Sequence, residues 1–129
     1  MERDPQQELF MQLKQDIEAF GYSVYDGVLP PANTPYPFVY LGDFQQTDTE
    51  LKDAVHGIVY PVIHVWHNDP HKRGTVSLMM LNIKSACRNI GKTENFAWFV
   101  QSMNARIIPD NSTAQPLLHG VIEPTFKFS

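Results

Sequence analysis

Two segments of the chain repeat hydrophobic residues at every third or fourth position, the spacing of a helix. The first predicts a helix that Asp4 can cap and Gly21 can end, with Pro5 at its first helical position. The second predicts a helix that Thr75 can cap and Gly91 can end. Each helix would present one apolar stripe to another element. The stripe residues are Leu9, Phe10, Leu13, Ile17 and Phe20, then Val76, Met79, Met80, Ile83, Cys87 and Ile90.

The other hydrophobic segments predict strands. Residues 24–25, 38–41 and 57–67 are rich in β-branched and aromatic residues, and so are the segments 95–110 and 117–129. Between 57 and 67 both odd and even positions are apolar, which is typical of a central strand covered on both faces. Pro61 within this segment requires an edge or a bulge, because proline cannot donate a hydrogen bond to a ladder.

These elements occur in the order helix, two or three strands, helix, two strands. The simplest architecture is an α+β fold in which two helices pack on one face of an antiparallel sheet. We find no internal repeat or linker, so residues 1–129 are expected to form a single domain. The inward stripes place five residues in the core: Leu13, Ile17, Trp66, Met79 and Ile83.

The segment 43–53 interrupts the hydrophobic pattern with four acidic residues: Asp43, Asp48, Glu50 and Asp53. This segment has few hydrophobic side chains to bury, so we expect it to be an exposed loop or the tip of a long hairpin.

The amino-acid composition indicates a folded domain and excludes some kinds of site. Charged residues make up 19% and hydrophobic residues 43% of the chain, which fits a folded domain and not a disordered one. Cys87 is the single cysteine, so an internal disulfide and a four-cysteine zinc site are excluded. No secretory leader is expected, and no apolar run approaches the roughly 20 residues of a membrane span.

Charge is distributed unevenly along the chain. The net charge is -4, with a balance of -8 in residues 1–69 and +4 in residues 70–129. An acidic total argues against a dedicated nucleic-acid-binding protein, whose affinity depends on neutralising phosphates. The simpler expectation is that these charges mix in space once the chain folds. If they stay apart, they suit head-to-tail association between copies.

Candidate chemistry is confined to the stretch HVWHNDPHKRG, residues 64–74. His64 and His67 are three residues apart on a predicted strand, so they should lie on opposite faces. Only His67, Asp69 and His71 could converge on a metal ion, and the stretch lacks the helical H-E-x-x-H pattern of zinc proteases. The segment 68–70 is better interpreted as a turn, and no catalytic residue, cofactor or metal is expected.

The order of motifs resembles the tail terminator family of long-tailed phages, also called tail completion or tail-to-head joining proteins. An amphipathic helix ends in GYSVYDG and a proline-rich connection, and TPYPFVYLGDFQQTDT follows. Then IVYPVIHVWHNDPHKRGTVSLMM resembles the family's strand, turn and helix, and LLHGVIEPTFKF resembles its C-terminal strand. The turn HNDPHKRG is longer and more basic than the family pattern.

This resemblance implies a structural virion protein without catalytic activity or cofactor. Such proteins form a ring, usually of six subunits, that caps the tail tube at the head–tail junction of the virion after assembly in the host cytoplasm. The implied partners are other copies of the chain, the major tail tube protein, the head-completion (stopper) protein and the phage DNA, which passes through the lumen without specific binding. The candidate ring or partner interface consists of Asp43, Asp48, Glu50, Asp53, Lys72 and Arg73.

Two alternatives from other classes stay open. One is a small metal-dependent enzyme that uses His67, Asp69 and His71. The other is an adaptor that binds a partner protein by adding a strand at an open sheet edge.

Overall fold

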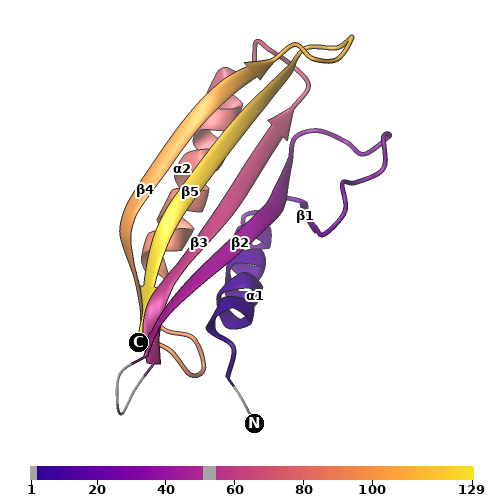
Figure 1. Ribbon diagram of the computed structural model, residues 1–129. Helices are drawn as coiled ribbons and strands as arrows, with labels where there is room; N and C mark the ends of the chain where they lie inside the picture. Colours follow the sequence, from indigo (N-terminus) through magenta and orange to yellow (C-terminus); the bar gives the residue numbers. More distant parts are fainter. Residues whose placement is uncertain (1–2, 51–54) are drawn as a thin grey trace.

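The structure, a computed structural model, describes residues 3–50 and 55–129 as a five-stranded sheet covered on one face by two helices (Figure 1). The elements in chain order are α1 (Pro5–Glu18), β1 (Val24–Asp26), β2 (Phe38–Glu50), β3 (Val55–His67), α2 (Arg73–Asn89), β4 (Trp98–Asp110) and β5 (Leu117–Phe128). The strand order is β1-β2-β3-β5-β4, so the predicted α+β architecture is confirmed. Every neighbouring pair is antiparallel except β1 and β2, which are parallel. No helix in the described part of the chain is long and apolar enough to span a membrane.

The first helix begins where its sequence predicts, but the second does not. The side chain of Asp4 accepts a hydrogen bond from the backbone N–H of Gln7 and Pro5 opens α1, as expected. Helix α2 instead begins at Arg73, two residues before the predicted cap Thr75, and Lys72 precedes it without a side-chain cap. The turn over residues 68–70 is confirmed, and it delivers the chain directly into the helix.

The sheet accommodates its prolines at irregular points. The β2–β3 register shifts between Leu41 and Phe44, which is the bulge that Pro61 required. The β3–β5 ladder is also unpaired around Pro61 and Pro124, between the pairs Val59–Phe126 and Ile63–Ile122. Two prolines that cannot donate therefore face each other across a gap in the central ladder.

The acidic segment is strand and not loop over most of its length. Strand β2 continues from Phe38 to Glu50 and pairs with β3 as far as Val55. The expected exposed loop is therefore wrong for residues 43–50. The alternative, a long hairpin, is correct, but these residues form one arm of it and not its tip. Asp53 lies outside the described residues. The pattern was misleading because β2 is exposed along this stretch, so its polar side chains meet solvent and not the core.

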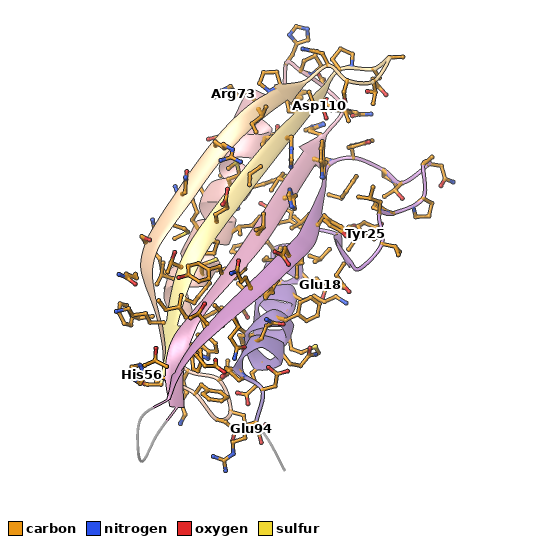
Figure 2. All side chains as sticks on the ribbon, viewed as in Figure 1. Glu18, Tyr25, His56, Arg73, Glu94 and Asp110 are labelled. Atoms are coloured by element: carbon orange, nitrogen blue, oxygen red, sulfur yellow. The ribbon has the colours of Figure 1, made fainter. Side chains whose placement is uncertain are left out.

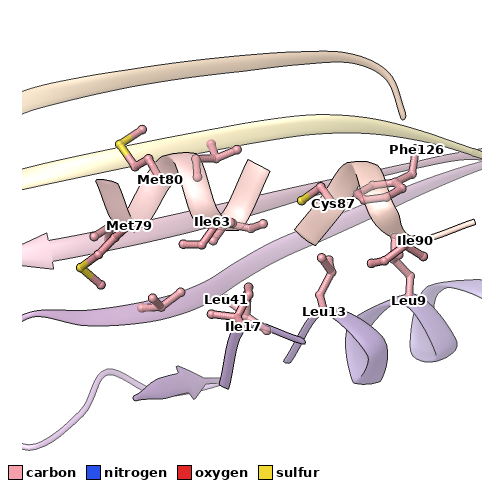
Figure 3. Packing of buried hydrophobic residues seen from close by; sticks show 14 of the residues in the cluster. Leu9, Leu13, Ile17, Leu41, Ile63, Met79, Met80, Cys87, Ile90 and Phe126 are labelled. Carbon is pink, nitrogen blue, oxygen red and sulfur yellow. The ribbon is translucent and has the colours of Figure 1, made fainter. Parts of the chain in front are cut away.

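The core lies between the helices and the inner face of the sheet (Figure 3). Leu13, Ile17, Met79 and Ile83 are buried there as predicted, and Cys87 packs beside them. Burial raises the pKa of the Cys87 thiol to about 12, so this cysteine is unreactive.

Trp66 and Phe20 do not belong to the core. Trp66 lies on the opposite face of the sheet, because Val65 and Ile63 occupy the inward positions of β3. Phe20 is exposed beyond the end of α1, where it stacks on Tyr22.

The carboxylate of Glu8, which is partly buried, links α1 to the loop that precedes β4. Glu8 accepts hydrogen bonds from the Thr93 hydroxyl at 2.7 Å and from the Asn95 backbone and side-chain amides at 3.0 and 2.7 Å. The Trp98 indole in turn donates to Thr93 at 2.8 Å. Burial raises the pKa of Glu8, but these hydrogen bonds outweigh it and leave the pKa below its usual value.

Candidate interaction surfaces

The outer face of the sheet, which neither α1 nor α2 covers, carries a cluster of stacked rings from β3 and β5. The β3–β5 register sets Trp66 opposite His119, and their rings stack at 3.8 Å between centroids and 7° between planes. The Nδ1 atom of His64 lies 2.7 Å from Nε2 of His119. Gly42 of β2 leaves room for the His64 ring, since a Cβ there would lie 2.8 Å from its Nε2 atom. We call His64, Trp66 and His119 the outer-face cluster.

The two histidines of the outer-face cluster are held in their neutral forms. Burial lowers the pKa of His119 to about 4, and the neighbouring His64 lowers it too. Burial also lowers the pKa of His64, against a smaller opposing effect of Glu123. One neutral ring can donate to the other across the 2.7 Å contact, whereas two charged rings would both be donors and repel.

We expect the free energy of unfolding to fall as the pH falls from about 6.5 to 4. The unfolded chain protonates His119 near pH 6.5, and the folded chain only near 4. Protons therefore favour the unfolded state within this window, and the stabilisation is fully present above it. Urea denaturation at several pH values measures the effect.

His119→Gln, which cannot be protonated, should flatten this dependence, whereas the same replacement of the exposed His71 should leave it unchanged. An equal slope in all three chains would contradict the assignment.

The three candidate metal ligands, His67, Asp69 and His71, are not grouped around a common point. Asp69 accepts a hydrogen bond from the backbone N–H of His71 at 2.9 Å through its Oδ1 atom. His71 is exposed, and the Nδ1 atom of His67 is buried and has no hydrogen-bond partner among the described residues. Within residues 3–50 and 55–129, no three His, Cys, Asp or Glu side chains are grouped to hold a metal ion. The geometry gives no support to a metal site at His67, Asp69 and His71.

The candidate interface residues fall at two separate places. Asp43 and Asp48 are exposed on β2, and Glu50 is the last residue of that strand. Lys72 and Arg73 are exposed at the start of α2, at the opposite end of the sheet from the β2–β3 hairpin (Figure 2). The fold therefore does not bring the acidic and basic residues together within one subunit.

Charge is separated across the width of the sheet. The helix and strands of one side, α1, β1 and β2, contain seven acidic residues against Lys14: Glu8, Asp16, Glu18, Asp26, Asp43, Asp48 and Glu50. The other side, α2, β4 and β5, contains Arg73, Lys84, Arg88, Arg106 and Lys127 against Asp110 and Glu123. Figure 2 places Glu18 and Arg73 on these opposite sides.

The expectation that the charges mix on folding is therefore wrong. The ion pairs among the described residues, Lys14–Asp26 at 3.6 Å and Arg106–Glu123 at 3.4 Å, each stay on one side. The reason is the strand order, since the sheet keeps the N-terminal strands together and adds β5 and β4 beyond β3. We call the two sides the acidic side and the basic side.

Sequence reasoning found the charged segments but missed the outer-face cluster. His64 and His119 are 55 residues apart, and only the β3–β5 register brings them together. The available signal was a histidine in each of two segments predicted to be strands.

Comparison with known proteins shows a similarity of fold and nothing beyond it. No family model and no curated protein matches the chain. It is similar to a chain in the virion of a native gene transfer agent particle, with a TM-score of 0.64, 19% sequence identity, and coverage of 95% of this chain and 94% of that one. A second solved structure, of a protein without a functional name, has a TM-score of 0.59, 11% identity, and coverage of 98% and 97%. The fold is therefore shared over almost the full length of both chains.

Proposed function

We propose that this protein is a non-enzymatic structural component of a phage-type virion that acts as a tail terminator. It forms a ring, of six subunits in the virion, that caps the tail tube and presents its other face to the head-completion (stopper) protein. The ring binds the major tail tube protein, and DNA crosses its lumen without specific contacts. The protein assembles in the host cytoplasm and resides at the head–tail junction.

The observation that carries this proposal is the separation of charge between the acidic side and the basic side. A ring needs two different surfaces that complement each other, because each subunit contacts its two neighbours in a heterologous way. The acidic side and the basic side lie at opposite edges of one sheet and have opposite signs. The fold likeness to a chain of a virion supports the same proposal.

The chemistry of the described residues favours a binding role over catalysis. The thiol of Cys87 is buried with a raised pKa, and the histidines of the outer-face cluster are neutral and engaged with each other. The outer-face cluster lies on an open sheet face, and within the described part of the chain no three His, Cys, Asp or Glu side chains are grouped to hold a metal ion. We therefore assign no catalytic residue and no cofactor.

Reversing Lys72 and Arg73 to Glu should reduce the joining of heads to tails while the subunit still folds. Acidic residues at a helix N-terminus are favourable for the helix dipole, so α2 should tolerate Lys72→Glu and Arg73→Glu. Exposed charges contribute little singly, but a ring repeats each contact. A complementation assay measures the yield of joined particles, and electron microscopy counts free heads and tails.

The matched control makes the same change in net charge at Arg3→Glu and Lys92→Glu, which are exposed and lie outside the elements of the acidic side and the basic side. It should lower the yield less than the Lys72 and Arg73 reversal does. Normal yield with the Lys72 and Arg73 reversal would remove these residues from the interface. Complete particles in a producing strain that lacks the gene would refute the tail-terminator role itself.

A further inference from the structure

The sheet has an open edge on each side. Strand β4 pairs with β5 from Trp98 to Asp110, and on its other edge the Trp98 N–H donates to the Gly91 carbonyl at 3.0 Å. Among the described residues no further strand pairs with β4, so this edge is open from Phe99 onward. On the other side β1 covers β2 only at Val39–Leu41, so the rest of β2 pairs only with β3. The amide of Gln6 donates to the carbonyl of Phe44 at 2.9 Å and covers one point of this edge. The free part of β2 is therefore residues 45–50.

The two open edges have strand directions that suit each other. Strand β2 is antiparallel to β3, β3 to β5, and β5 to β4, so β2 and β4 of one subunit run in opposite directions. In a ring whose axis follows the strands, every subunit keeps the same strand direction. The β4 edge of one copy then meets the β2 edge of the next as an antiparallel pair, with the helices of both copies on the same face.

The residues beside these edges also match in charge. Next to β4 lies a groove of about 300 Å³ between this strand and α2, which is lined by Arg73, Lys84 and Arg106 among others. Beside the β2 edge, Asp43 and Asp48 are exposed. Leu41, Ile63, Ile122 and Ala105 form one row across the sheet. Asp43 lies just beyond this row toward the β2–β3 hairpin, and Arg106 lies one residue beyond it in the other direction.

From these observations we infer that successive copies of this chain join by pairing the β4 edge of one copy with residues 45–50 of β2 in the next, which makes one continuous sheet around the ring. An unpaired strand edge offers its backbone N–H and C=O groups to a second chain. The opposite charges beside the two edges favour pairing of β4 with β2 of the next copy over pairing with a copy in the reverse orientation. The inference rests on the proposed ring and adds to it the segment that each subunit uses.

Engineered thiols test the inference. Gln45 pairs with Tyr60 and Ser102 with Thr125, and these positions lie on the outer face at the same height on opposite edges. Both Gln45 and Ser102 are exposed, and the native Cys87 is buried. Two double variants are needed. The first carries Gln45→Cys and Ser102→Cys, and the second carries Gln45→Cys and Asn104→Cys, which samples the next position on the outer face. Each variant would be supplied as the sole copy of the chain during particle production.

Mild oxidation of the assembled particles should give a ladder of disulfide-linked oligomers from at least one of these chains, as seen on a non-reducing gel. The single replacements should give no ladder. The matched control joins Gln45→Cys to Ser85→Cys, which is exposed on α2 away from the edge, and should give none either. Particles that contain the double variants but give no ladder would overturn the edge pairing and leave the proposed ring in place. Absence of the wild-type chain from purified particles would instead overturn the proposed function, and the inference with it.

Discussion

Replacing Phe126 with Ala is expected to lower the free energy of unfolding by about 3–5 kcal/mol. Phe126 is the largest of the fully buried side chains, with 0% of its surface exposed, and its ring lies edge-on to Trp98. It sits on β5 between α2 and the sheet, where Val59 of β3 and Val100 of β4 are its neighbours in the ladders. Truncation there leaves a cavity that three strands and a helix would have to close.

Urea denaturation with a linear extrapolation measures this loss. The matched control is Phe99→Ala, an aromatic residue on β4 that is 57% exposed on the outer face. It contacts the Lys127 ammonium at 5.9 Å from the ring centroid, so its loss should cost well under the loss at Phe126. Equal effects at the two positions would show that the core does not lie where the sheet register places it.

The second large effect is expected at the contact between the helices. Leu13→Ala and Ile83→Ala should each cost about 2–5 kcal/mol, because both side chains are completely buried and belong to one cluster. Each helix offers its own control on its solvent face. Met11→Ala on α1 and Leu81→Ala on α2 remove side chains that are 55% and 57% exposed.

The same denaturation experiments compare the four chains. The two controls should stay within about 0.5 kcal/mol of the wild type, as surface replacements usually do. If Leu13→Ala and Ile83→Ala were also neutral, the packing of two helices on one sheet face would be wrong.

The sequence by itself determined the elements whose signals are local. Asp4, Pro5 and the stripe from Leu9 to Ile17 specify α1, because capping and helical periodicity act within a few residues. The hydrogen bond from the His71 backbone to Asp69 closes the turn before α2 in the same way. The choice of an α+β fold followed from the order of such elements.

Only the tertiary structure decided which face each strand buries. Strand β3 is apolar at both odd and even positions, so its pattern could not tell that Ile63 points to the helices and Trp66 away from them. A period of two residues fixes the alternation of side chains but not its sense when both faces are apolar.

The candidate surfaces, too, were determined partly by the sequence and partly by the tertiary structure. The sequence showed acidic residues in one half of the chain and basic residues in the other, because charge can be counted without a fold. Whether these halves mix depends on strand order, and the order β1-β2-β3-β5-β4 keeps them apart. The contact between His64 and His119 depends likewise on the pairing of β3 with β5. Such long-range pairing arises from the burial of the whole inner face, which no local segment contains.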